Sequence, residues 1–91
     1  ATVPVLVDFW AEWCQPCLRL GPTVEGLAAE FEGKLIVGKM DVDQNPMIPS
    51  RFGVRSIPML ILFKGGQVAE QSVGVVSKDA LKKMVEPHIA A

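Results

Sequence analysis

The stretch VDFWAEWCQPCLRL, residues 7–20, contains both cysteines of the chain, Cys14 and Cys17, separated by two residues. Before the cysteines, residues 3–10 are β-branched and aromatic and are apolar on both faces, which is typical of a strand in the middle of a sheet covered on both sides. After them, apolar residues recur at helical spacing, at Leu20, Val24, Leu27, Ala28 and Phe31. The stretch therefore predicts a central strand, a loop that carries the cysteines, and a helix.

The rest of the chain extends this pattern to an α/β fold. Residues 35–42 read as a second strand, and a strand, helix, strand unit of this length closes parallel and right-handed. Asn45 and Pro46 predict the N-cap and first residue of a short helix that reaches about Phe52. Residues 59–73 predict two antiparallel strands joined by Gly65 and Gly66.

Ser77 predicts the N-cap of a closing helix with an apolar face. That face carries Leu81, Met84, Val85, His88 and Ile89. We expect residues 1–91 to form a single domain, because a chain of this length buries only enough apolar surface for one modest core.

Composition narrows the function classes. The chain has 49% apolar and 21% charged residues and a net charge of −1, without the basic excess that nucleic acid or an anionic membrane surface would require. The apolar runs VPVLV and IPMLILF are far shorter than the roughly 20 residues of a membrane helix. No basic start followed by an apolar signal segment is present, so we expect a cytoplasmic protein that binds neither nucleic acid nor membrane.

The cysteine pair can be interpreted as part of a zinc site, as a structural disulfide or as a redox couple, and each interpretation requires different features of the chain. A tetrahedral zinc site needs four ligands, and the two cysteines with the single His88 are too few. A structural disulfide stabilises by closing a long loop, whereas this pair encloses two residues. A redox couple needs an exposed, readily ionised thiol with a second held behind it, and Cys14 at a helix start with Cys17 one turn further fits this.

At these residues the chain resembles the thioredoxin family. VDFWAEWCQPC looks like the active-site segment of that family, and DVDQNP, SIPM, LFKGGQV and VGVVSK follow in family order. The resemblance implies a three-layer thioredoxin-like fold and a protein-disulfide reductase without a bound cofactor or metal. Cys14 would attack a substrate disulfide, Cys17 would release the product, and an upstream thioredoxin reductase would restore the dithiol.

The resemblance also assigns roles to other residues. Asp8 would be the buried acid that exchanges a proton with Cys17, near the ammonium of Lys39; from the residues alone, Asp8 is equally a hydrogen-bonded strand residue.

The substrate surface would consist of four residues. Pro58 would be cis and face the disulfide, although from the sequence alone it is only the first residue of a strand. The backbone of Ile57 would pair with an extended substrate segment. Trp13 and Gly74 would complete this surface, while Trp10 would pack in the core.

Three departures from the family pattern keep alternatives open. Gln15 replaces a glycine, Leu18 replaces a common lysine, and Met59 replaces a usual threonine. The alternatives are a disulfide oxidase or isomerase, whose reduction potential would be less negative, and a binding module that uses the apolar rim without turnover.

Thioredoxins carry about twenty more residues before the point at which this sequence starts, which form a strand and a helix. By that topology we expect a truncated, four-stranded mixed sheet in the order 2-1-3-4, with the strand of residues 35–42 at its edge. We predict self-association, because the backbone of this edge strand is unpaired and its side chains are mostly apolar, with only Lys34 and Lys39 to discourage pairing.

Overall fold

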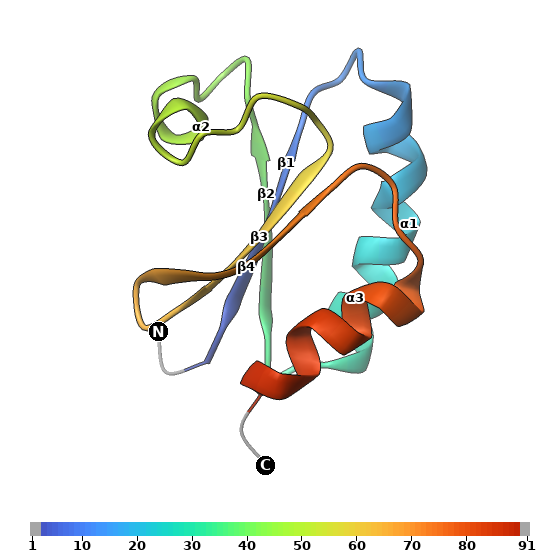
Figure 1. The fold of residues 1–91 in the computed structure, drawn as a ribbon. Helices are drawn as coiled ribbons and strands as arrows, with labels where there is room; N and C mark the ends of the chain where they lie inside the picture. Colours follow the sequence, from blue (N-terminus) through green and yellow to red (C-terminus); the bar gives the residue numbers. More distant parts are fainter. Residues whose placement is uncertain (1–2, 90–91) are drawn as a thin grey trace.

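Strand β1 (Val5–Trp10) lies inside a four-stranded sheet of order β2-β1-β3-β4 in the computed structural model, which describes residues 3–89 (Figure 1). Strand β2 (Ile36–Asp41) runs parallel to β1. Strands β3 (Met59–Lys64) and β4 (Gln67–Val73) are antiparallel to β1 and to β3, respectively. The predicted strand order and the interior position of β1 are confirmed.

Helices cover the two faces of the sheet unequally (Figure 1). Helix α1 (Gln15–Glu30) and helix α3 (Lys78–Val85) pack on one face. The core on that face consists of Leu6, Leu20, Val24, Leu27, Leu35, Leu60, Leu62, Leu81 and Val85. The other face has a smaller core of Phe9, Met59 and Ile61, beside the short helix α2 (Met47–Arg51). Because β1 contributes Leu6 to one core and Phe9 to the other, it is apolar on both sides.

The start of α2 differs from the prediction. The helix begins at Met47 after Pro46, which takes the N-cap position and makes no side-chain capping hydrogen bond. The Asn45 side chain instead donates from Nδ2 to the carbonyl of Asp41 at 3.2 Å. Asn45 therefore stabilises the turn after β2 rather than the helix, because a nearby backbone carbonyl competes for its amide.

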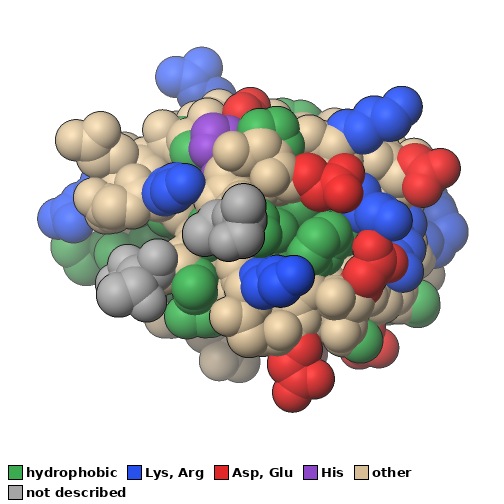
Figure 2. All heavy atoms as spheres, turned by 90° about the horizontal axis from the view of Figure 1, so that it is seen from below, with side chains coloured by type: hydrophobic (Ala, Val, Ile, Leu, Met, Phe, Trp, Pro, Cys, Tyr) green, Lys and Arg blue, Asp and Glu red, His purple; other side chains and the backbone are tan. Residues whose placement is uncertain are grey.

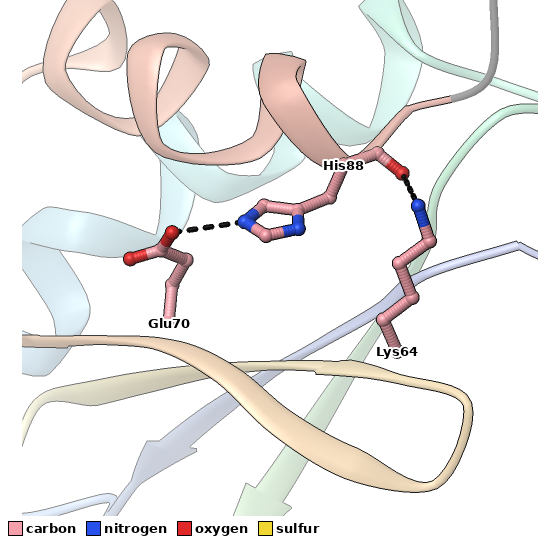
Figure 3. Close-up of polar contacts among 3 residues, drawn as sticks. All are labelled: Lys64, Glu70 and His88. Carbon is pink, nitrogen blue, oxygen red and sulfur yellow. Dashed lines mark hydrogen bonds and ion pairs between the residues drawn. The ribbon is translucent and has the colours of Figure 1, made fainter.

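The C-terminal segment is fastened to the β3–β4 hairpin. As predicted, the Ser77 hydroxyl caps α3 by accepting from Ala80 N at 3.1 Å, and a 3₁₀ turn, η1 (Glu86–His88), follows the helix. His88 Nε2 lies 2.9 Å from Glu70 Oε2, and Lys64 Nζ donates to the His88 carbonyl at 2.8 Å (Figure 3). His88 thus belongs to this contact and not to the cysteine pair.

The sheet face that carries α2 is incompletely covered. Ile36 is 48% exposed and Val68 is 40% exposed. A Cβ added at Gly38 would meet no atom within 4 Å. At the end of the molecule away from the cysteine loop, Figure 2 shows apolar side chains between basic and acidic ones. Within residues 3–89, no helix is both long and apolar enough to cross a membrane.

Candidate redox site

The two cysteines form a disulfide where β1 gives way to α1. Cys14 and Cys17 are bonded, with their Cα atoms 5.2 Å apart. Cys14 is the N-cap of α1, and its Sγ accepts a hydrogen bond from Cys17 N at 3.2 Å. Pro16 occupies the first turn, where a missing N–H breaks no helical hydrogen bond. The free N–H groups and dipole of the helix start favour negative charge on the Cys14 sulfur once the disulfide is reduced.

The two cysteines differ less in exposure than a redox couple with an exposed first thiol requires. Cys14 is 4% exposed and Cys17 is 2% exposed, so the expectation of an openly exposed Cys14 is wrong. The reason is a small apolar cluster in which both cysteines pack with Ala11, against Trp10, Val42 and Ile57. A reacting partner must therefore fit closely against this rim to reach the Cys14 sulfur.

The loop before β3 lies directly beside the disulfide. The Ile57–Pro58 peptide is cis, and the Ile57 carbonyl oxygen lies 3.9 Å from Cys14 Sγ. Gly74 N donates to the Pro58 carbonyl at 2.8 Å, and Gly74 has φ of 90°, which favours glycine. The structure thus places the Ile57–Pro58 peptide beside the disulfide and Gly74 beside Pro58, although these residues follow Cys14 by more than forty positions in the chain.

Trp13 extends the surface on the other side of Cys14. Its side chain is 66% exposed, and Nε1 donates to Asp43 Oδ2 at 2.7 Å. Asp43 is itself positioned by Asp41, whose Oδ1 accepts from Asp43 N at 2.8 Å and from Gln44 N at 3.3 Å. Sequence reasoning missed Asp43; the available signal was an Asp two residues after Asp41, a residue type that forms such turns at strand ends.

Asp8 is a buried carboxyl on β1 without a partner. It is fully buried, and neither side-chain oxygen accepts a hydrogen bond from any residue in the described range 3–89. Burial raises the pKa of Asp8 from its ordinary 3.8 to about 6, and the nearby positive charge of Lys39 opposes the rise. The structure therefore shows no hydrogen bond from residues 3–89 to Asp8 of the kind that the alternative, a hydrogen-bonded strand residue, would use.

Lys39 connects Asp8 to the tryptophan at the end of β1. Lys39 lies opposite Asp8 in the β1–β2 register. Its Nζ lies 4.3 Å from the centre of the Trp10 ring, within the range of a cation–π interaction. Trp10 is only partly buried, so it contributes to the rim of the site as well as to packing.

No metal centre accompanies the disulfide in the described part of the chain. Residues 3–89 contain no group of three or more His, Cys, Asp or Glu side chains placed to hold a metal ion. The site that the structure shows is a disulfide at a strand-to-helix junction.

Comparison with known proteins identifies the family in which this fold and this cysteine pair occur. The family described as "Thioredoxin" matches residues 1–87. The chain is 51% identical over 85 residues to "Thioredoxin" of Chlorobaculum thiosulfatiphilum, which covers 93% of this chain and 79% of that protein. It is 49% identical over 87 residues to "Thioredoxin 1" of Nostoc sp., with 96% and 81% covered. The solved structure of a mutant thioredoxin from Halobacterium salinarum has a TM-score of 0.89 at 43% identity and covers 97% of this chain and 76% of that chain.

The chain belongs to the thioredoxin family. It is a thiol-disulfide oxidoreductase that reduces protein disulfides through the Cys14–Cys17 pair, without a bound cofactor. The partners typical of this family are proteins that contain disulfides and a thioredoxin reductase.

Proposed function

We propose that Cys14 is the attacking sulfur and Cys17 the resolving one. The Cys14 thiolate attacks a substrate disulfide, forms a mixed disulfide and releases one substrate thiolate. The Cys17 thiolate then attacks Cys14 Sγ, releases the second substrate thiolate and closes the Cys14–Cys17 disulfide. Two electrons pass from the dithiol to the substrate. The observation that supports this order is the N-cap position of Cys14, which favours its thiolate.

We propose that Asp8 takes the proton of Cys17 when the mixed disulfide resolves. A pKa of about 6 suits a group that accepts and returns protons near neutral pH. Lys39 acts as a positioning charge that keeps this pKa from rising further. In the oxidised state neither Asp8 oxygen accepts a hydrogen bond from the part of the chain that the structure describes, so the proton reaches it through water or after a small movement.

We propose that substrates bind as an extended segment beside the backbone of Ile57, with Pro58, Gly74 and Trp13 as the surrounding surface. Strand addition of this kind supplies main-chain hydrogen bonds without demanding one substrate sequence. The 3.9 Å separation between the Ile57 carbonyl and Cys14 Sγ supports this placement, because a segment bound there lies against the reacting sulfur. We propose that the protein acts in the cytoplasm, where an upstream thioredoxin reductase restores the Cys14–Cys17 dithiol.

The test uses reduction of insulin disulfides by the full chain. Cys14→Ser abolishes reduction and traps little substrate, because no attacking thiolate remains. Cys17→Ser also abolishes turnover but accumulates mixed disulfides with substrates, which are visible on non-reducing gels. Wild-type rates in Cys14→Ser would refute the proposed order, as would equal trapping by the two variants.

We also propose that residues 1–91 act as one domain and that copies of the chain self-associate through β2 or the partly covered face of the sheet. The exposure of Ile36 and Val68 on that face supports the proposed self-association.

A further inference from the structure

The turn that follows β2 reaches the redox loop from the neighbouring strand. Strands β1 and β2 are parallel and Trp10 lies opposite Asp41, so the segments after both strands leave the same end of the sheet (Figure 1). Val42 N donates to the Trp10 carbonyl at 2.9 Å, and the Val42 side chain packs against the cluster that contains both cysteines. One residue further, Asp43 accepts the indole N–H of Trp13. This turn therefore lines one side of the redox site.

Asp41 holds the backbone of this turn with both its side chain and its carbonyl. Its Oδ1 accepts from Asp43 N at 2.8 Å and from Gln44 N at 3.3 Å. Its carbonyl oxygen accepts from Asn45 N at 3.0 Å and from Asn45 Nδ2 at 3.2 Å. An aspartate that bonds to the backbone two residues later fixes a turn in this way. Asp41 therefore determines where Asp43 lies.

We propose that Asp41 is a positioning residue that sets how tightly protein disulfides bind, because it holds Asp43 and, through Asp43, the indole of Trp13. This inference rests on the proposed substrate surface and adds to it the residue that keeps its exposed indole in place. Two hydrogen bonds in series connect Asp41 to Trp13, one of 2.8 Å to Asp43 N and one of 2.7 Å from Trp13 Nε1.

A fixed indole lowers the cost of binding a protein. Trp13 is 66% exposed, so packing alone restrains the ring weakly. A free ring loses rotamer freedom when a substrate protein packs against it, whereas a ring held by a hydrogen bond has lost this freedom before binding. Freeing one such side chain should weaken binding by roughly two- to tenfold. The effect belongs to protein substrates, because a small disulfide is too short to cover the indole while it reacts at Cys14.

A purely structural role for Asp41 makes a different prediction. If Asp41 satisfied the N–H groups of the turn and did nothing more, its removal would lower stability. The indole of Trp13 and the affinity for protein substrates would then stay unchanged. The two roles are therefore separable by measurements on Trp13 and on substrate binding.

Hydrogen exchange measured by NMR tests the structural link. Asp41→Ala removes Oδ1, so exchange of Asp43 N–H and of Trp13 Nε1–H should rise by roughly two- to tenfold, the effect of one ordinary hydrogen bond. Asn45 N–H donates to the backbone carbonyl of residue 41, which this substitution keeps, so its exchange rate is the internal control. Asp41→Asn retains an acceptor oxygen and should restore wild-type exchange. Unchanged exchange at Trp13 Nε1 in Asp41→Ala would overturn the proposal.

Single-turnover oxidation of the reduced full chain tests the effect on substrates. In Asp41→Ala, the ratio of the second-order rate constant for insulin to that for hydroxyethyl disulfide should fall by roughly two- to tenfold. The half-saturating insulin concentration should rise by the same factor at an unchanged maximal rate. Asp41→Asn should return both values to those of wild type. An unchanged ratio in Asp41→Ala would overturn the proposed role in binding.

A double substitution tests whether Asp41 acts through Asp43. In an Asp43→Ala background, Asp41→Ala should not lower the insulin ratio further, because the link to Trp13 is already broken. Additive effects of the two substitutions would overturn the proposed path. Circular dichroism checks folding, and Asp41→Val, which removes the same acceptor with a strand-favouring residue, gives a second measurement of each quantity. None of these outcomes bears on disulfide reduction itself, which Cys14→Ser tests.

Discussion

At the scale of single residues, the buried Asp8 affects both the stability of the protein and the proposed proton transfer. A carboxyl that is fully buried without a hydrogen bond from residues 3–89 is costly to ionise, and within that range only the charge of Lys39 compensates. A purely structural core would place an apolar residue at this position in β1. The cost of Asp8 is consistent with a residue retained for proton transfer.

The pH dependence of stability should report this cost. Because folding raises the pKa of Asp8 from 3.8 to about 6, the unfolded chain releases this proton at lower pH than the folded chain. Stability from Asp8 is therefore present below about pH 4, falls as the pH rises toward 6, and is lost above it, a loss of roughly 3 kcal/mol. Urea unfolding of wild type and Asp8→Asn at pH 4 and pH 7 measures it.

We expect Asp8→Asn to remove this decline, so that the variant gains stability relative to wild type between pH 4 and pH 7. The matched variant is needed because other groups titrate in the same range: Lys82 and Lys78 lower the pKa of Glu30, which acts in the opposite direction. An equal stability difference between the two proteins at both pH values would contradict the assignment.

Asp43 is the residue that fixes Trp13 beside the disulfide. Asp43→Ala removes the acceptor of the indole N–H, so hydrogen exchange at Trp13 Nε1 should rise by roughly two- to tenfold, the effect of one ordinary hydrogen bond. Asp43→Asn keeps an acceptor oxygen and serves as the control. Indole N–H exchange followed by NMR is the measurement, and identical exchange in all three proteins would show that Asp43 does not hold the ring.

At the scale of elements, the β3–β4 hairpin depends on its two glycines. Gly65 and Gly66 have φ of 62° and 79°, in the region that other residues avoid. Gly66→Ala should destabilise the protein by about 1–2 kcal/mol. Gly21→Ala, inside α1 where a Cβ meets nothing within 4 Å, should instead stabilise it by up to about 1 kcal/mol. Urea unfolding that shows the same sign for both substitutions would refute this explanation.

Elements with strong periodicity or turn chemistry were predictable from sequence, and elements set by competing local contacts were not. The apolar run of β1, the glycines of the hairpin and the cap of Ser77 each depend on a local rule that the fold obeys. The start of α2 was misplaced because Asn45 bonds to Asp41 rather than to the helix.

The same distinction applies to the site. The spacing of Cys14 and Cys17 indicated redox chemistry from the sequence alone. The low exposure of Cys14 arises from packing between segments distant in sequence, so no local pattern reveals it. The aspartates at 41 and 43 indicate a turn, but not the hydrogen bond from Trp13 to Asp43, which joins residues thirty positions apart.

At the scale of the whole molecule, the two faces of the sheet differ in the size of the core that they carry. The face under α1 and α3 holds the larger core, and Lys78 and Lys82 of α3 pair with Glu30 at the end of α1. The other face, with α2 at one end, has the smaller core and leaves Ile36 and Val68 partly exposed. The disulfide lies beyond the carboxyl end of β1, which pairs with a strand on each side.

The Cys14–Cys17 pair reduces protein disulfides, and measuring the reduction potential of the pair is the sharpest check of this activity. Equilibration of the full chain with glutathione redox buffers, followed by quantification of free thiols, gives the value. A reductase should be more negative than about −260 mV, close to the roughly −270 mV known for thioredoxin itself. A value between about −180 and −120 mV, the range of disulfide isomerases and oxidases, would show that the pair is not poised as a reductase.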